Sequence, residues 1–334
     1  MTQPRPRILV LSTGGTIAGQ AASAAGARYV SGQVGIDTLL EAADSGTGDV
    51  DLAGIAIATV GSQDMDRRIW ARLHAEIAAA FAQDRADGIV ITHGTDTAEE
   101  TAFLLDLTLP PTRPVVLVGA MRPANALGAD GPRNLANAIG VAAAVEAYGR
   151  GVLVVMGDAV FEARSVYKAG TNGTDAFRAF PGGPVGAVTP SSLHFFAPAT
   201  TPRATAAYRL PPPPDWPIVA ILHIHADMDL AIVDAILASD VAGVVLAGVG
   251  HGNAPRAVLD RLGRAAHRGV AVVRASRIDA GAVARDTEVD DEALGFLAGG
   301  TYSPQKCRLL LQLLIANAIL DPIARQNAFL NPGA

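Results

Sequence analysis

The sequence predicts an α/β protein with a larger N-terminal domain, in which helices flank a mainly parallel sheet, and a smaller C-terminal α/β domain. Short apolar runs alternate with helical patterns along the 334 residues, as in successive βαβ units. Half of the residues are hydrophobic and only 17% are charged, which suits a sizeable core. A proline-rich stretch from Pro190 to Pro217 separates the two halves. We therefore expect domains at 1–195 and 218–334, joined by a linker at 196–217.

The predicted strands of the first domain each end in a loop of glycine and polar residues. Strands are expected at 7–12, 55–60, 89–92, 115–118 and 151–156. Helices are expected at about 66–83, 98–107 and 130–145. Ser62 or Asp64 is a candidate cap of the first helix, and Thr97 with Glu100 forms a capping box for the second. Right-handed crossovers would bring the loops after 12, 60, 92 and 118 to one edge of the sheet, where α/β proteins bind ligands.

The loop after residue 92 places two reactive groups side by side. Thr95 and Asp96 follow a buried strand and precede a helix, so a possible nucleophile and a carboxylate share a rigid corner. Glycine, threonine and aspartate are also ordinary turn and cap residues, and an ordinary βα loop explains this stretch alone equally well.

The first loop, Thr13-Gly-Gly-Thr-Ile-Ala-Gly19, also lets the backbone approach a ligand closely. Its glycine spacing does not match the G-x-G-x-x-G of a dinucleotide site. The small-residue run Gln20 to Arg28 that follows predicts a mobile flap, and Tyr29 lies near its end. Tyr29 is either a packing residue or a side chain that closes over Thr16.

The remainder of the chain predicts fewer functional features. Residues 160–180 read as a loop, in which Lys168 has the surroundings of an ordinary solvated lysine. Further strands are expected at 218–223, 244–246 and 270–274, and helices at 255–267 and from Ser303-Pro304 onward, with 309–320 in the core.

Composition argues against several classes of function. The net charge is −6 without a basic cluster, which disfavours nucleic acid or an anionic membrane as partner. Cys307 is the single cysteine, and His223 and His225 have no third ligand at a suitable spacing, so no metal site is expected. No apolar run has the length of a spanning helix. The start of the chain has no signal-peptide pattern, so we expect a cytoplasmic protein, or a periplasmic one if a leader was removed.

Six motifs in order resemble the bacterial-type (type II-like) L-asparaginases. They are Thr13 to Gly19, Gly61-Ser-Gln-Asp-Met65, His93-Gly-Thr-Asp-Thr-Ala-Glu-Glu100, Gly119-Ala-Met-Arg-Pro123, Asp286-Thr-Glu-Val-Asp290 and Ser303-Pro-Gln-Lys306. The resemblance runs from Ile8 to about Phe329, and the two threonine motifs together make it specific.

The resemblance implies hydrolysis of asparagine to aspartate and ammonia, often with some activity on glutamine, without a cofactor or metal. It implies Thr16 as the nucleophile, Tyr29 beside it and Glu288 orienting that tyrosine, with Thr95, Asp96 and Lys168 as a second triad. The substrate contacts that it implies are Gly15, Ser62, Gln63, Thr95, Asp96, Ala120 and His251. It also implies a site shared between the large domain of one subunit and the small domain of its neighbour, hence a homodimer, usually doubled to a tetramer.

The chemistry leaves two questions open. A lysine has an ordinary pKa near 10.4, so a lysine base at neutral pH needs a drop of roughly three units, about 4 kcal/mol. Asp96 opposes that drop by stabilising the ammonium, whereas burial favours it. The sequence therefore allows Lys168 as a base or as a fixed charge, and either threonine as the first nucleophile. We prefer Thr16 because the adjacent flap would exclude water on closing.

Four positions depart from the common family pattern. His251 stands where many relatives have asparagine; histidine ordinarily gains a proton near pH 6.5, which would change how a substrate ammonium is held. Ala169, Gly170 and Ala257 replace residues that are often polar. These changes bear on affinity, pH profile and the preference between asparagine and glutamine.

Other classes of function remain as alternatives. A two-domain protein that binds an amino acid without turnover would use the same polar groups, and a glutaminase-preferring enzyme would use the same chemistry. A nucleotide-dependent enzyme is disfavoured by the broken glycine pattern. A transamidation subunit acting on aminoacyl-tRNA is disfavoured by the acidic charge.

Overall fold

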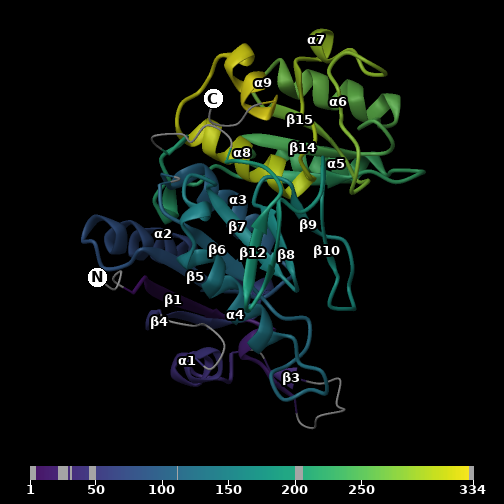
Figure 1. Ribbon diagram of the computed structural model, residues 1–334. Helices are drawn as coiled ribbons and strands as arrows, with labels where there is room; N and C mark the ends of the chain where they lie inside the picture. Colours follow the sequence, from purple (N-terminus) through teal and green to yellow (C-terminus); the bar gives the residue numbers. More distant parts are fainter. Residues whose placement is uncertain are drawn as a thin grey trace. The chain divides into compact units, whose positions relative to one another are not determined.

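The computed structural model describes residues 5–21, 29–30, 32–44, 50–110, 112–199 and 206–330. The chain divides into two compact units, Met1–Ala206 and Ala207–Ala334. Figure 1 shows the elements of both units.

Unit 1 is built on an eight-stranded sheet in the order β12-β11-β8-β7-β6-β5-β1-β4. Five strands pair in parallel: β1 (Arg7–Gly14), β4 (Asp51–Val60), β5 (Gly88–Thr92), β6 (Val115–Val118) and β7 (Val152–Met156). Three antiparallel strands extend one edge: β8 (Ala159–Glu162), β11 (Gly186–Thr189) and β12 (Ser192–Phe195). The predicted α/β class and mainly parallel sheet are confirmed.

The order of the parallel strands creates a switch point between β1 and β5. The chain leaves β1 for β4 on one side, returns to β5 on the other side, and continues outward to β6. The chain therefore continues from β1 and from β5 toward opposite edges of the sheet, and ligands of open α/β sheets bind at the carboxyl ends of the strands beside such a reversal. Thr16 follows β1 and Thr95 follows β5, so the switch point lies between the two predicted threonine loops.

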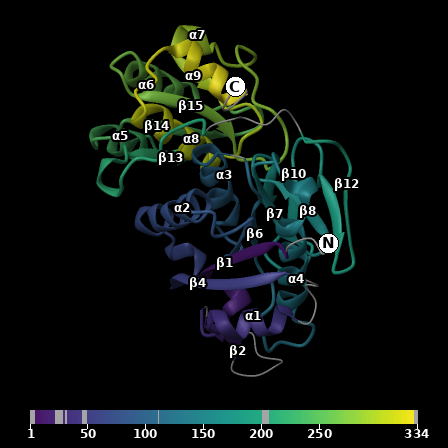
Figure 2. The ribbon, with the colours of Figure 1, turned by 60° about the vertical axis from the view of Figure 1, so that its left-hand side comes forward.

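Helices cover both faces of this sheet. Contacts with the strands place α1 (Ile36–Asp44) and α4 (Gly131–Ala143) on one face and α2 (Arg67–Ala82) and α3 (Ala98–Thr108) on the other. Figure 2 shows α1 and α2 on opposite sides of β1 and β4.

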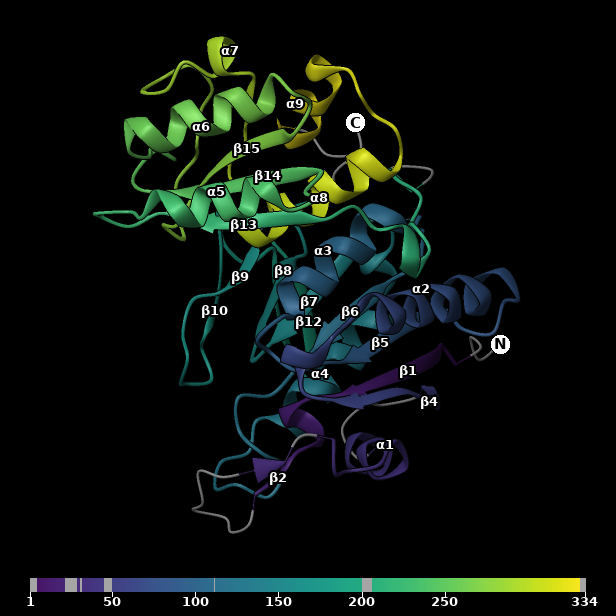
Figure 3. The same cartoon turned by 180° about the vertical axis from the view of Figure 1, so that it is seen from behind.

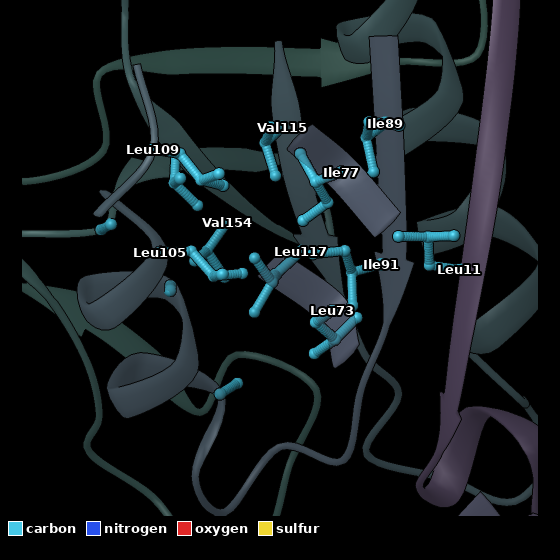
Figure 4. Packing of buried hydrophobic residues seen from close by; sticks show 14 of the residues in the cluster. Leu11, Leu73, Ile77, Ile89, Ile91, Leu105, Leu109, Val115, Leu117 and Val154 are labelled. Atoms are coloured by element: carbon cyan, nitrogen blue, oxygen red, sulfur yellow. The ribbon is translucent and has the colours of Figure 1, made fainter. Parts of the chain in front are cut away.

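Alternate residues of the strands supply two hydrophobic cores. Leu11, Ile89 and Ile91 pack under Leu73 and Ile77 of α2 (Figure 4). The intervening residues, among them Val10 and Val90, pack against α4. Each fully buried aliphatic side chain of this kind stabilises a fold by about 1.5–3 kcal/mol, so the strand ends are held in a rigid frame.

Unit 2 has a smaller, wholly parallel sheet. Its order is β13 (Val219–His223), β14 (Gly243–Gly248), β15 (Ala271–Ser276) and β16 (Phe296–Ala298). The helices are α5 (Leu230–Ala238), α6 (Arg256–Ala266), α7 (Asp291–Leu294), α8 (Pro304–Ala316) and α9 (Pro322–Leu330). Helices α5 and α6 contact each other, and α8 contacts β13, β14 and β15 (Figure 3). Among the described residues, no helix combines the length and apolarity that a bilayer crossing requires.

Several predicted elements need correction. The supposed loop at 160–180 contains most of β8, which forms a hairpin with β7. It also contains a second hairpin, made of β9 (Val166–Lys168) and β10 (Phe177–Ala179). The proline-rich stretch beginning at 190 contains β12. These short strands include polar residues and lack the continuous apolar runs that marked 89–92 and 115–118, which explains both errors. The core helix predicted at 309–320 ends at Ala316, and Leu320 is 71% exposed.

The predicted helix caps are also revised. The α2 cap is Asp66, which accepts from the backbone N–H groups of Arg68 and Ile69, both at 2.8 Å. Ser62–Asp64 instead forms a 3-10 turn. Thr97 occupies the N-cap position of α3, but its hydroxyl makes no capping bond. The predicted flap at 20–28 lies outside the described residues, except for β2 (Gln20–Ala21), which pairs with β3 (Tyr29–Val30).

Candidate active site

Three loops at the carboxyl ends of the parallel strands pack closely together through two glycines. Gly15 has φ of 78°, and a Cβ there would lie 2.4 Å from the Gly94 nitrogen. A Cβ on Gly94 would lie 2.7 Å from the Ser62 Oγ. At Gly15 a side chain would displace the Gly94 backbone, and at Gly94 a side chain would collide with the Ser62 side chain, so glycine permits both approaches. The loops that carry Thr16, Ser62 and Thr95 are therefore neighbours in the folded unit.

The Lys168 ammonium joins two of the predicted catalytic residues. Its Nζ donates to the Thr95 Oγ1 at 2.9 Å and to the Asp96 Oδ1 at 2.5 Å. The lysine side chain is 15% exposed, whereas that of Asp96 is 64% exposed. Lys168 is thus a largely buried donor that points at a threonine hydroxyl, and not the solvated lysine that its local sequence indicates.

Strand β9 sets the position of Lys168, and Glu99 holds that strand. The Lys168 backbone N–H donates to the Glu99 Oε2 at 2.8 Å, and Glu99 is buried on the first turn of α3. Sequence reasoning missed Glu99, because an acidic residue in the first turn of a helix is also favoured by the helix dipole. The bond ties Lys168 to the helix that directly follows Thr95 and Asp96.

Ser62 connects its loop to the Thr95 loop. Its Oγ accepts from the Asp96 backbone N–H at 3.2 Å, and its carbonyl oxygen accepts from the Thr97 hydroxyl at 2.8 Å. The Thr97 hydroxyl therefore fixes a neighbouring loop in place of capping its own helix. Gln63 is exposed, and its side-chain amide donates to Asp64 at 3.2 Å.

A buried hydrogen-bond chain supports the backbone beneath Thr95. The His93 Nδ1 lies 2.7 Å from the Gly94 carbonyl oxygen, and its Nε2 lies 2.9 Å from the Thr101 hydroxyl. That hydroxyl also accepts from the Trp70 Nε1 at 2.9 Å. Burial lowers the pKa of His93 to about 4, because the charged imidazolium would lose its hydration. His93 is consequently neutral at physiological pH.

A cavity of about 830 Å³ lies elsewhere in unit 1, and none of the predicted catalytic side chains lines it. Its charged lining includes Arg122, Arg133 and Arg178. Each guanidinium already donates to protein oxygens: Arg122 to a carbonyl, and the other two to aspartates. We therefore locate the candidate site at the strand ends and not in this cavity.

Unit 2 carries the two remaining predicted residues on adjoining loops. His251 lies in the loop after β14, and its Nδ1 is 2.8 Å from the Thr287 hydroxyl. Glu288 lies in the loop before α7, and its Oε2 accepts from the Asn253 side-chain amide at 2.9 Å.

The structure thus links Ser62 with Asp96, and Lys168 with Thr95 and Asp96, by hydrogen bonds, and it packs Gly15 against Gly94 beside them. Thr16 is buried and begins the turn that follows Gly15, and Ala120 is buried directly after β6, beside Gly119. A Cβ on Gly119 would lie 2.9 Å from the Thr95 methyl group. The Tyr29 side chain lies outside the described part of the chain. The catalytic and binding roles of these residues stay predictions. Among the described residues, no group of three or more potential metal ligands occurs.

The fold and the cluster define a two-unit α/β protein whose switch point presents threonine hydroxyls, a carboxylate and a buried ammonium, a set suited to acyl transfer. Comparison with known families identifies it further. Residues 7–201 match the model described as "Asparaginase, N-terminal", and residues 218–329 match "Glutaminase/Asparaginase C-terminal domain". The chain belongs to the asparaginase family, as the sequence motifs indicated.

Relatives over nearly the whole chain agree. The chain is 43% identical to the "Probable L-asparaginase periplasmic" of Haemophilus influenzae, over 97% of this chain and 92% of the relative. It is 41% identical to "L-asparaginase 2" of Escherichia coli, with the same coverage. It is 33% identical to a "Glutaminase-asparaginase" of Pseudomonas fluorescens, over 92% of this chain and 86% of the relative. A crystal structure of "Probable Cytoplasmic L-asparaginase from Campylobacter jejuni" matches with a TM-score of 0.91 and 37% identity, over 98% of this chain and 99% of that one.

Proposed function

We propose that the protein is an L-asparaginase, which hydrolyses the side-chain amide of asparagine to aspartate and ammonia through a threonine acyl-enzyme. The observation that carries the proposal is that the Lys168 Nζ donates to both Thr95 and Asp96. The loop that contains this threonine and aspartate packs against the Gly15–Thr16 turn. Family membership and relatives named as L-asparaginases support the same activity.

In the proposed first step, the Thr16 hydroxyl oxygen attacks the side-chain amide carbon of asparagine. A C–O bond forms, the C–N bond breaks, and the hydroxyl proton passes to the departing nitrogen, which leaves as ammonia. Water then attacks the ester carbon, the C–O bond to Thr16 breaks, and aspartate leaves while Thr16 regains its proton. Dividing the hydrolysis in this way replaces one difficult attack on an amide by two easier steps.

Lys168 acts in this proposal as a charged donor and not as a base. Its Nζ forms an ion pair with the Asp96 carboxylate at 2.5 Å, in which the lysine is the donor. Because Nζ donates to the Thr95 Oγ1, the Thr95 hydroxyl hydrogen is directed away from the lysine. We infer that this hydroxyl orients the attacking water or the amide.

The polar groups around the cluster suit an amino-acid substrate. The Ser62 Oγ accepts from a backbone N–H, so its own hydrogen can be donated to the substrate α-carboxylate. The exposed carboxylate of Asp96 can bind the α-ammonium. Gln63, Ala120 and the backbone of Gly15 complete the proposed contacts with the substrate.

The test is steady-state release of ammonia from asparagine by the wild type, Thr16→Ala and Thr16→Ser. We expect Thr16→Ala to lose at least about 10³-fold in kcat, because the nucleophile is gone. Calorimetry should still show aspartate binding to that variant, whereas Thr16→Ser keeps a hydroxyl and should keep part of the activity. Binding of asparagine by the wild type without ammonia release would instead support the amino-acid-binding alternative. Full turnover by Thr16→Ala would reject Thr16 as the nucleophile.

Glutamine is the second candidate substrate, because two related Pseudomonas proteins are named glutaminase-asparaginases. Both amides present the same carboxamide, and glutamine adds one methylene, which a pocket discriminates by about 10- to 200-fold. Measuring ammonia release from both amides at matched concentrations determines the preference.

We further propose a homodimer with shared active sites, doubled to a tetramer, in which Glu288 of one subunit serves the Thr16 site of another. The apolar helix α5 supports association: Val233 is its buried residue, while Ile232 is 48% exposed. Light scattering measures the mass. Mixing inactive Thr16→Ala and Glu288→Ala subunits should restore activity, because a mixed dimer contains one intact site. Recovery of no activity from mixed dimers would contradict a shared site.

We propose a cytoplasmic location, with the periplasm as the alternative. The matched relatives include one named periplasmic and one named cytoplasmic. Fractionation of the native host by osmotic shock separates the two locations.

A further inference from the structure

The loop that carries Glu288 is anchored on its inner side by a buried ion pair. The Arg274 guanidinium donates to both carboxylate oxygens of Asp291, at 2.5 and 2.6 Å, and both side chains are fully buried. Arg274 also donates to the carbonyl oxygens of His251, at 2.9 Å, and Ala284, at 3.0 Å. Asp291 accepts from the Asp286 backbone N–H at 2.9 Å. One pair thus fastens the loop after β14 to the loop before α7.

Thr287 and Glu288 lie beyond these anchors, and both are exposed. Side chains from the loop after β14 hold them: the His251 ring contacts Thr287, and Asn253 contacts the Glu288 carboxylate. The direction of the Glu288 carboxylate therefore depends on the two contacts on the outer side of the loop.

The His251 ring closes a small cycle of hydrogen bonds. The Ala284 backbone N–H donates to its Nε2 at 3.3 Å, so Nε2 carries no hydrogen. In a neutral imidazole the hydrogen is then on Nδ1, which donates to the Thr287 Oγ1 at 2.8 Å. The Thr287 hydroxyl in turn faces the Ala284 carbonyl oxygen at 3.5 Å. Both ring nitrogens are consequently used within unit 2.

We propose that His251 and Thr287 are positioning residues for the Glu288 carboxylate. They form a latch, defined here as the His251 ring with Thr287 and the backbone of Ala284, that holds the loop and not the substrate. The role rests on the proposed asparaginase function, in which Glu288 orients Tyr29. It assigns His251 a task different from the substrate contact that the sequence predicts.

The test compares Thr287→Val with Thr287→Ser in the full-length protein. Valine keeps the shape of threonine and removes the hydroxyl, whereas serine keeps the hydroxyl. We expect Thr287→Val to lower kcat/KM for asparagine about fivefold, the effect of one ordinary hydrogen bond. Thr287→Ser should stay within about twofold of the wild type by the same reasoning. Because Thr287 is exposed, we expect both variants to fold.

The same substitutions in a Glu288→Gln background separate positioning from a general structural effect. In that background the Glu288 carboxylate is absent, so a latch that acts by positioning it has no further effect. Thr287→Val should then change kcat/KM by less than about 1.5-fold. In the wild-type background, Thr287→Val should change the same kinetic parameter, kcat or KM, that Glu288→Gln changes.

Any of three results would overturn the latch while the enzyme remains active. The first is a kcat/KM of Thr287→Val equal to that of the wild type, and the second is an equal loss of kcat/KM from Thr287→Val in the Glu288→Gln background. The third is a kcat/KM of Glu288→Gln equal to that of the wild type. Absence of ammonia release from the wild type would instead reject the proposed function itself.

Discussion

Acidification should destabilise unit 1 through His93, which lies directly under the Thr95 loop. The pKa of His93 is lowered to about 4 from the ordinary 6.5, because the ring is fully buried. In the unfolded chain the ring is hydrated and takes up a proton near its ordinary pKa. Between these two values the unfolded state binds more protons, so the free energy of unfolding falls as the pH falls.

The size of this effect follows from the shift. About 2.5 pKa units at 1.36 kcal/mol per unit give about 3 kcal/mol. This contribution is complete above about pH 6.5, declines as the pH falls, and is lost below about pH 4. It is a large part of the 5–15 kcal/mol that stabilises a typical domain. Glu162, whose pKa is raised by burial, contributes with the opposite sign, so a comparison between variants is needed.

The assay is urea unfolding at several pH values between about 7 and 4.5, followed by tryptophan fluorescence. Of the two tryptophans, Trp70 belongs to unit 1 and donates to Thr101 beside His93, and Trp216 belongs to unit 2. A Trp216→Phe background therefore reports on unit 1. His93→Gln, which cannot be protonated, should lose stability at neutral pH and show a flatter dependence on pH.

The matched control is His194→Gln, because His194 is exposed on β12 in the same unit. It should keep the wild-type slope. Equal slopes for His93→Gln and the control would refute the reasoning. If His93→Gln fails to fold, an NMR titration of the His93 ring in the folded wild type decides, and protonation near pH 6.5 refutes the reasoning.

Three further predictions concern the site and the core. Lys168→Met should lower kcat for asparagine by at least about 10²-fold, because the charged donor to Thr95 is lost; ammonia release measures it, and near-wild-type kcat would contradict the assigned role. Gly15→Ala should lower the free energy of unfolding in urea by about 2–3 kcal/mol, because the new methyl group clashes with the Gly94 backbone and the residue has a positive φ. The control Gly140→Ala has open space around it in α4 and should be neutral or stabilising. Burial raises the pKa of the Cys307 thiol, so iodoacetamide should alkylate it only in denaturant, as mass spectrometry will show.

Much of the frame could be predicted because its signals are local. Apolar runs such as 89–92 form β5 within one residue of the expected bounds, and glycine with threonine marked both loops at the switch point. The antiparallel edge formed by β8, β11 and β12 could not be predicted, since each of these strands has four residues and β11 pairs with β8 across a separate hairpin. Helix α5 was missed because its sequence is apolar apart from Asp234 and so shows no polar stripe of helical period.

The same division applies to the site. Thr95, Asp96 and Ser62 could be nominated because a strand end followed by a helix is a known place for ligands. Lys168 could not be nominated from its surroundings, because its burial comes from the β9–β10 hairpin and from Glu99 on α3. The His251–Thr287 contact joins residues 36 apart in the sequence, and no spacing rule anticipates it.

Strand β1 has a consequence for biosynthesis, because it lies inside the sheet with β4 on one edge and β5 on the other. It leaves the ribosome before the other strands of the sheet, yet its second neighbour is complete only at Thr92. Until then the backbone N–H and C=O groups along at least one edge of the apolar strand β1 are unpaired. Such an edge can pair with a strand of another chain. Nascent chains that stall before that point should therefore be the form of this protein that most needs a chaperone.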